Sequence, residues 1–354
     1  MTSSRRLRRI IGLMLALVLL VSCNADPSIS TATPLPPTSL PVTPTFPASL
    51  PTAMATPEPQ ALPRFDMTVC PFALPAGEVL GKTVDCGYLI VPERRDAPQS
   101  PTVRLALARF RAMDGNVDGG PWVYVAGGWG NSVQGLVSNT TGSFRREATT
   151  HHDFIVYDQR GVGLSQPSLT CPELGDTALA AYQQPTSAGS SVPPAVAAAS
   201  HCHDRLVQQG IDVTAYTSVE DAADLNDLRV ALGYRQLNLS GISYGTVRAL
   251  TVMRDFPDAV RSAVLDSTAP LQTNLITDWG GNFDRALRLL FARCVADSRC
   301  HSAYPTLESD FSQVVAQLNA APASITITDP KSGQSYPLVI TGTRLVPHHS
   351  DYAG

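Results

Sequence analysis

Residues 237–245, Leu-Asn-Leu-Ser-Gly-Ile-Ser-Tyr-Gly, limit what this chain can fold into more than any other stretch. Apolar residues alternate and then meet Gly241-x-Ser243-x-Gly245, and residues 246–254 follow as a predicted helix. Strand, sharp turn and helix in this order are typical of a nucleophile elbow, which holds a reactive serine at the apex of a strained turn. The flanking glycines let the strand and the helix approach without a clash at Cβ. An incidental Ser-Gly turn remains the alternative, because the short motif alone is common.

Segments on both sides of this elbow predict strands that alternate with helices. The predicted strands are residues 87–91, 102–110, 122–126, 154–157 and 263–266. A helix is predicted over 218–232, with Ser218 as its N-cap and Gly233 ending it. Residues 177–200, rich in Ala, Ser and Pro, are interpreted as a surface excursion. The alternation indicates an α/β fold with a doubly wound, mostly parallel sheet.

Composition excludes one class of partner and indicates no cofactor. Charged residues make up 16% of the chain, the formal net charge is −4, and no basic stripe lies beyond the first ten residues. Nucleic acid is therefore excluded as a partner, because nothing could neutralise its phosphates. His201-Cys202-His203 could form a metal clip, but no second ligand pair has suitable spacing, so we predict no metal and no cofactor.

The first 63 residues are expected to direct export and anchoring rather than to fold into a domain. Four arginines in the first nine residues precede an apolar run, 10–21, which is too short to span a bilayer but suits a signal peptide. Residues 20–23, Leu-Val-Ser-Cys, resemble a bacterial lipobox, which implies a signal peptide over 1–23 and lipid modification of Cys23. An ordinary secretory signal with an incidental cysteine is the alternative. Residues 24–63, rich in Pro and Thr, are expected to form a disordered tether, so we predict an exported cell-surface lipoprotein held at the membrane by its lipid.

Six cysteines remain once Cys23 is set aside. They are Cys70, Cys86, Cys171, Cys202, Cys294 and Cys300. An even number of cysteines in an exported chain indicates disulfides. Several pairings are open, and we expect each cysteine to pair with its neighbour along the chain.

After the predicted strand that ends at Asp266, the pattern changes from strands alternating with helices to successive amphipathic helices. Two amphipathic stripes follow, one around Phe283 to Phe291 and one around Leu307 to Leu318, and the last two cysteines lie between them. We interpret them as the start of a helical lid, so that 64–275 forms the core and 276–354 the lid and C-terminal part. Core helices of the sheet itself are the alternative. A short hairpin is predicted over 324–341.

Taken in order, these pieces resemble the α/β-hydrolase superfamily and, within it, the proline iminopeptidase and tripeptidyl-aminopeptidase-like branch. The resemblance covers about residues 66–345. The motifs that carry it are Cys-Gly-Tyr-Leu-Ile-Val-Pro at 86–92, the Gly-Gly loop at 127, Tyr-Asp-Gln-Arg-Gly-Val-Gly-Leu-Ser at 157–165, Asp-Leu at 224 through Arg-Val-Ala-Leu-Gly at 229–233, Gly-Ile-Ser-Tyr-Gly-Thr at 241–246, Phe-Pro at 256 and Val-Leu-Asp at 264–266. Their shared order is more specific than any one of them.

The resemblance implies a serine hydrolase that removes residues or short peptides from the N-termini of peptide substrates. Ser243 would be the nucleophile, and the backbone N–H of Tyr244 would be one oxyanion donor. The second donor would come from the loop at Gly128 and Trp129. The family usually has proline after the two glycines, and Trp129 stands there instead. Asp158 and Arg160 are expected to brace their loop rather than to act chemically.

The same chemistry needs a base for the serine proton and a carboxylate that orients the base, in the chain order Ser, acid, His. The remaining candidates for the base are His301, His348 and His349, and Asp266 is the candidate acid. No strand followed by Gly-x-x-Asp and no Gly-His turn lies beyond the lid. We therefore expect a C-terminally truncated member that lacks the last strands and is weakly active or inactive. An esterase or lipase on the same fold, or a catalytically dead surface lipoprotein, are the alternative functions.

Overall fold

The computed structural model describes residues 61–345 apart from short gaps. The gaps are 98, 116–117, 129–132, 134, 136, 138–141, 185–191, 275–276 and 331, together with the side chains of 142–145 and 192–193. All described residues belong to the second of the chain's two units, Pro59–Gly354. The expected signal segment, the tether up to residue 60, Cys23, Trp129, His348 and His349 lie outside the described residues.

Seven strands form the central sheet in the order β1-β2-β3-β5-β4-β6-β7. Their bounds are β1 Arg64–Thr68, β2 Val84–Pro92, β3 Thr102–Phe110, β4 Trp122–Val125, β5 Phe154–Tyr157, β6 Leu237–Ile242 and β7 Val260–Asp266. The pairs β4–β5, β4–β6 and β6–β7 are parallel, whereas β1–β2, β2–β3 and β3–β5 are antiparallel. Only β1 and β3 therefore run against the other strands of this sheet, which confirms the predicted mostly parallel arrangement.

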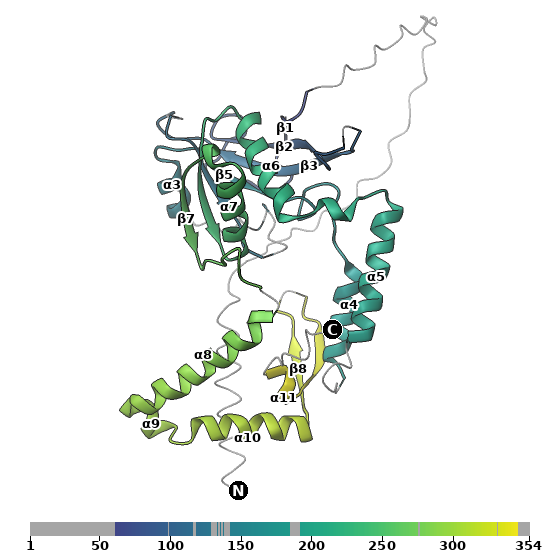
Figure 1. The fold of residues 1–354 in the computed structure, drawn as a ribbon, viewed down its shortest axis with the longest axis vertical. Helices are drawn as coiled ribbons and strands as arrows, with labels where there is room; N and C mark the ends of the chain where they lie inside the picture. Colours follow the sequence, from purple (N-terminus) through teal and green to yellow (C-terminus); the bar gives the residue numbers. More distant parts are fainter. Residues whose placement is uncertain are drawn as a thin grey trace, which may run out of the picture. The chain divides into compact units, whose positions relative to one another are not determined.

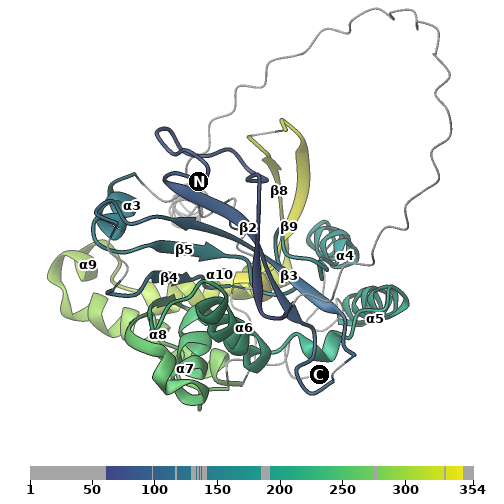
Figure 2. The ribbon, with the colours of Figure 1, turned by 90° about the horizontal axis from the view of Figure 1, so that it is seen from above.

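Helices cover both faces of this sheet, as a doubly wound fold requires. The helices between the strands are α3 Gly142–Thr149, α4 Pro172–Tyr182, α5 Val192–Gln208, α6 Ser218–Ala231 and α7 Tyr244–Asp255, with 3₁₀ turns at Val213–Ala215 and Pro257–Ala259. Buried leucines, valines and alanines of α6 and α7 pack on one face of the sheet. Val133 and Val137, together with Ala148 of α3, pack on the other. Figures 1 and 2 show α6 and α7 together on one side of the strands.

The segment interpreted as a surface excursion is largely helical where the structure describes it, and α4 has no buried residue, which is consistent with a surface position. Most of residues 177–200 lie in α4 and α5. Alanine is the strongest helix former, and the prolines at the start of each helix lie in the first turn, where a missing N–H costs nothing.

Beyond β7 the chain forms helices and a separate hairpin. These elements are α8 Thr277–Ala296, α9 Ser298–Ala303, α10 Leu307–Ala320, β8 Ala323–Thr328, β9 Ser335–Ile340 and α11 Gly342–Leu345. The antiparallel hairpin β8–β9 is a sheet of its own, which confirms the predicted hairpin and shows that these strands do not extend the central sheet. Whether this part acts as a lid stays a prediction.

All three predicted disulfides are present. Cys70 pairs with Cys86, Cys171 with Cys202, and Cys294 with Cys300. The second joins the start of α4 to α5, and the third closes the junction of α8 and α9. Within the part of the chain that the structure describes, no helix has both the length and the apolar character needed to cross a bilayer.

Candidate active site

Ser243 occupies the sharp turn between β6 and α7, with φ 53° and ψ −123°. A positive φ is rare for a residue with a Cβ and persists only where the surroundings hold it. Here the N–H of Ser243 donates to the carbonyl of Asp266 at 2.9 Å, and the N–H and hydroxyl of Thr246 donate to the carbonyl of Ser243 at 2.9 and 2.6 Å. The side chain of Ser243 is exposed to solvent. The strand–turn–helix order predicted from the sequence is therefore present.

The two flanking glycines are required by close backbone approaches. A Cβ added at Gly241 would lie 2.7 Å from the carbonyl oxygen of Gly245. A Cβ at Gly245 would lie 2.8 Å from the carbonyl carbon of Val125 and closer still to its oxygen. Both distances are inside van der Waals contact, so the motif spacing lets α7 begin directly against β4 and β6.

The Gly-Gly loop after β4 lies against the backbone of the serine. A Cβ added at Gly127 would lie 2.7 Å from the carbonyl oxygen of Ile242 and 2.9 Å from the Cβ of Ser243. Gly128 is exposed and has a φ of 68°, a conformation that favours glycine. Tyr244 is the first residue of α7, where backbone N–H groups point out of the helix end. These neighbours are suited to face an oxyanion formed at Ser243, although Trp129 lies outside the described residues.

Both segments reach the carboxyl edge of the sheet at its topological switch point. The chain leaves β4 toward β5 on one side and returns to β6 on the other, and β4 and β6 are parallel neighbours with Val125 opposite Gly241. Ligands of open α/β sheets bind outside the carboxyl ends of the strands at this kind of position. Ser243 and the Gly127 loop therefore stand where the fold places a binding site.

The N-cap of α6 differs from the prediction. Thr217 is the cap, and its hydroxyl accepts a hydrogen bond from the N–H of Glu220. Ser218, the predicted cap, instead forms a 2.6 Å hydrogen bond with the hydroxyl of Tyr244. Two adjacent hydroxyl residues are similarly good caps by propensity, so local sequence could not separate them. The contact ties α6 to the residue after the nucleophile.

The candidate acid lies at the same edge of the sheet as the serine. Asp266 is the last residue of β7, opposite Ile242, and its exposed carboxylate accepts a hydrogen bond from Ser267 at 3.1 Å. Ser267 has a φ of 54°, so the chain turns sharply directly after this strand. The charge of Asp266 adds to the effect of burial in raising the pKa of Tyr124, which comes from β4. The structure thus brings together Ser243, the Gly127 loop and Asp266.

The described residues bring no general base to the serine. His301, the one described candidate, is exposed in α9. Of the histidines that the structure describes, none hydrogen-bonds to Ser243 or Asp266; His151, His152 and His203 instead contact Asp114, the carbonyl of Gly120 and Asp204. The other two candidates from the sequence, His348 and His349, lie outside the described residues.

Asp158 braces the two loops at this edge, as expected from the sequence. Its buried carboxylate accepts hydrogen bonds from the N–H of Leu164 at 2.7 Å and from the N–H of Val133, just beyond the Gly-Gly loop. A Cβ at Gly163 would lie 2.7 Å from the carboxyl carbon of Asp158, so a larger residue would clash with this carboxylate at position 163. Burial raises the pKa of Asp158 to about 6, and the two N–H donors oppose that shift.

Asp158→Asn is expected to remove a pH-dependent part of the stability. A carboxyl group whose folded pKa is raised keeps its proton in the folded state while the unfolded chain releases it. Stability therefore falls as pH rises from about 4 to about 6 and levels off above, by about 3 kcal/mol for a two-unit shift. Measured by urea titration, the free energy of unfolding of Asp158→Asn minus that of wild type should therefore rise by about 3 kcal/mol from pH 4 to pH 6. Asp176→Asn, at an exposed position of α4, controls for loss of a carboxyl group. A difference in the free energy of unfolding between Asp158→Asn and wild type that stays constant from pH 4 to pH 6 would contradict the prediction.

A pocket of about 410 Å³ opens beside Tyr244. Its wall is the loop after β5 together with residues from the start of α4 and of α6. The lining residues are Gln159, Arg160, Gly161, Val162, Gly163, Leu169, Thr170, Tyr216, Thr217, Asp221 and Tyr244. The hydroxyl of Tyr216 donates to the carboxylate of Glu93 at 3.0 Å, and burial followed by this hydrogen bond raises the pKa of Tyr216, which stays a donor. The sequence did not indicate Tyr216, which lies in no motif, and it favoured for Asp221 only a capping-box role at the start of α6, whereas the buried Asp221 side chain pairs with Arg248.

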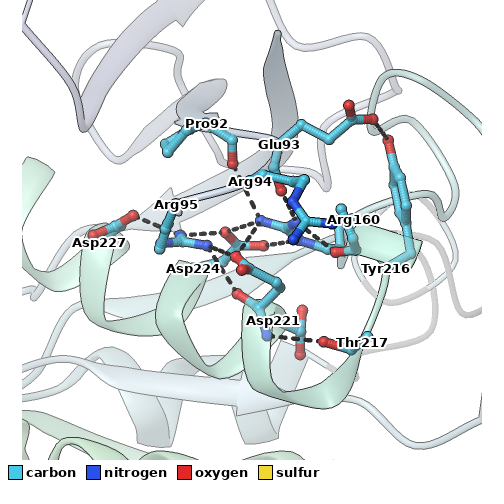
Figure 3. Close-up of polar contacts among 12 residues, drawn as sticks. Pro92, Glu93, Arg94, Arg95, Arg160, Tyr216, Thr217, Asp221, Asp224 and Asp227 are labelled. Carbon is cyan, nitrogen blue, oxygen red and sulfur yellow. Dashed lines mark hydrogen bonds and ion pairs between the residues drawn. The ribbon is translucent and has the colours of Figure 1, made fainter. Parts of the chain in front are cut away.

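A buried ionic network holds the pocket wall in place (Figure 3). Arg160 donates to both oxygens of Asp224, at 2.7 Å each, and to the carbonyls of Glu93 and Ala215 at 2.8 Å. Arg95 donates to the same carboxylate at 2.7 Å. Arg95 also pairs with two further carboxylates of α6, those of Glu220 and Asp227. The network joins the ends of β2 and β5 to α6, so Arg160 braces its loop as expected.

Comparison with known families assigns the fold. The family model described as the alpha/beta hydrolase fold matches residues 121–313, more than half of the chain. The chain belongs to the α/β-hydrolase fold family. This match covers the Gly-Gly loop, the elbow at Ser243 and the strand that ends at Asp266.

The relatives of this α/β hydrolase confirm its resemblance to the tripeptidyl-aminopeptidase-like branch. It is 32% identical over 192 residues to the tripeptidyl aminopeptidase of Streptomyces lividans, covering 53% of this chain and 36% of that protein. It is 28% identical over 251 residues to the serine protease Hip1 of Mycobacterium tuberculosis, strain H37Rv, covering 69% of this chain and 47% of that protein. The matched part thus spans less than half the length of these relatives.

Solved structures resemble this α/β hydrolase more weakly. The crystal structure of a proline iminopeptidase-related protein from Thermus thermophilus matches with a TM-score of 0.28 and 20% identity, covering 52% of this chain and 44% of that protein. A TM-score this low adds nothing to the assignment.

Proposed function

We propose that this α/β hydrolase is a serine hydrolase of the aminopeptidase type, which cleaves N-terminal residues or short peptides through an acyl-enzyme on Ser243. One observation carries the proposal: Ser243 is held at φ 53° at the carboxyl edge of the sheet, with the Gly127 loop packed against its backbone. A serine in this conformation costs stability and is found mainly where function uses it. The names of the two curated relatives support the peptidase class.

In the proposed reaction the hydroxyl of Ser243 attacks the carbonyl carbon of the scissile bond. Its proton passes to a general base, and the negative charge that develops on the carbonyl oxygen is met by the N–H of Tyr244 and by the loop at Gly128 and Trp129. The amine of the C-terminal product leaves with a proton, and water then releases the acyl group and regenerates the serine.

The acid and the base of this reaction remain proposals. Asp266 stands at the right edge of the sheet for an acid that orients a histidine. His348 and His349 are candidates for the base that lie outside the described residues, whereas His301 lies exposed on α9. An esterase would use the same groups, so the substrate class has to be decided by experiment.

The test compares a tripeptide p-nitroanilide with a free amine, its N-acetylated form, and a p-nitrophenyl ester. The full chain is assayed in imidazole buffer, which supplies a general base to the exposed serine. We expect turnover of the free-amine anilide, a fall in kcat/KM of roughly tenfold or more on acetylation, and none of this activity in Ser243→Ala. Turnover of the ester alone would favour an esterase. Peptide binding by a folded chain without any Ser243-dependent turnover would favour the dead surface lipoprotein.

We also propose that the protein is exported and held at the membrane by lipid on Cys23. The proposed export and lipid anchoring are supported by the arginine-rich start, the short apolar run and the lipobox-like Leu-Val-Ser-Cys. The three disulfides agree with an oxidising compartment. Mass spectrometry of the mature N-terminus should find a lipid-modified Cys23. An unmodified N-terminus in the membrane fraction would contradict the lipid anchor.

A further inference from the structure

Arg248 is a fully buried cation one turn into the helix that follows the nucleophile. It lies in α7, is only 2% exposed, and is the largest fully buried side chain of the described residues. Placing a guanidinium inside a protein is costly unless each of its donors finds a partner. An apolar side chain of similar volume could fill this space at lower cost, so the charge and the donors require an explanation.

The guanidinium contacts three different elements. It forms an ion pair with Asp221 of α6, in which one contact measures 3.2 Å. It donates to the hydroxyl of Tyr157 at the end of β5, and the central carbon of the guanidinium lies 5.2 Å from the centre of the Tyr157 ring. It donates to the carbonyl oxygen of Ala126, which follows β4, at 3.2 Å.

The contact with Ala126 bears directly on the serine site. Ala126 is the residue immediately before Gly127, where an added Cβ would lie 2.7 Å from the carbonyl oxygen of Ile242 and 2.9 Å from the Cβ of Ser243. Two successive glycines leave this loop with more backbone freedom than any other residues would. An oxyanion donor has to be held in place before the reaction, because reorganising it would consume the stabilisation that it provides.

We propose that Arg248 is a positioning residue for the oxyanion loop: its hydrogen bond to Ala126 sets the path of the chain into Gly127 and Gly128. Asp221 and Tyr157 hold the guanidinium so that this donor points at Ala126. Asp221 also lines the pocket beside Tyr244, so the same ion pair links the pocket wall to the loop. The inference rests on the proposed serine hydrolase function.

The test uses Arg248→Met, Arg248→Lys and Tyr157→Phe in the full chain. Met fills the volume without donors, Lys keeps one ammonium that can reach Ala126, and Phe removes a partner of Arg248 while leaving the bond to Ala126. The first readout is the rate at which a fluorophosphonate labels Ser243 in imidazole buffer, far below the melting temperature of each variant. The second is amide hydrogen exchange of the peptide that contains Gly127 and Gly128, which needs no activity.

We expect Arg248→Met to label about 100-fold more slowly than wild type, Arg248→Lys about tenfold more slowly, and Tyr157→Phe within about threefold. Exchange at Gly127 and Gly128 should be faster in both Arg248 variants and unchanged in Tyr157→Phe. If Arg248→Met does not fold, the comparison of Arg248→Lys with Tyr157→Phe decides whether Arg248 positions the loop at Gly127 and Gly128. Equal labelling and equal exchange in those two variants would overturn the proposal.

The two readouts separate the positioning role from the proposed function. If wild type is not labelled at Ser243, the hydrolase proposal fails, and the exchange comparison still shows whether Arg248 orders the loop. If wild type is labelled and the loop exchanges alike in all variants, only the positioning role fails.

Discussion

Gly245→Ala is expected to destabilise the protein by on the order of 3 kcal/mol and to abolish labelling of Ser243. The new methyl group would lie 2.8 Å from the carbonyl carbon of Val125 and 2.9 Å from the carbonyl oxygen of Ala126. Both neighbours are backbone atoms at the end of β4, so no side chain can turn away to make room. Either α7 moves off the sheet, or the end of β4 and the Gly127 loop move away from the serine.

The measurement is the urea midpoint of unfolding together with the labelling rate of the folded variant. Gly175→Ala is the matched control, because a Cβ added at this glycine of α4 meets nothing within 4 Å. The control should be neutral or more stable by up to about 1 kcal/mol, since alanine favours a helix. A Gly245→Ala protein with wild-type stability and labelling would show that the elbow is not packed as described.

Asp224→Ala is expected to destabilise the protein by about 3–5 kcal/mol, the usual cost of breaking a buried ion pair from one side. Asp224 is fully buried and is the shared acceptor of Arg160 and Arg95. Its removal leaves Arg160, also buried, with backbone carbonyls as its close acceptors. The wall of the pocket beside Tyr244 should loosen with it, because Arg160 lines that pocket.

Asp227→Ala is the control for this network, because it removes the same side chain about one turn further along α6. Asp227 pairs with Arg95, which keeps Asp224 and Glu220 as partners, so about 1 kcal/mol or less is expected. Both free energies of unfolding are measured in urea at neutral pH. Similar values for the two variants would mean that the network does not converge on Asp224.

Features that depend on a few neighbouring residues could be predicted from the sequence. The elbow at Ser243 follows from a strand, two glycines and a helix in succession, and the disulfides pair cysteines that are neighbours along the chain. Ser218 shows the limit of such reasoning, because Thr217 beside it is a similarly good cap and the choice depends on the distant Tyr244. The helices α4 and α5, which hold most of residues 177–200, were not predicted, although alanine favours a helix and proline is tolerated in its first turn.

Features that depend on tertiary contacts could not be predicted. Nothing in the sequence pairs Arg248 with Asp221, 27 positions earlier, or Arg95 with Asp224, 129 positions later. Asp266 could be named as a candidate acid, but its place beside the serine follows only from the parallel pairing of β6 and β7. The base stays open for the same reason, because a histidine can reach the serine from any distance along the chain.

The most direct test of Ser243 as the nucleophile is mass-spectrometric mapping of a fluorophosphonate adduct on the folded chain. The reaction is run with and without imidazole, beside Ser243→Ala. We expect one adduct, on the peptide that contains Ser243, absent from Ser243→Ala and formed faster with imidazole, because no described histidine contacts this serine. A folded chain that carries no adduct on Ser243 even with imidazole, or one whose adduct survives in Ser243→Ala, would contradict the account.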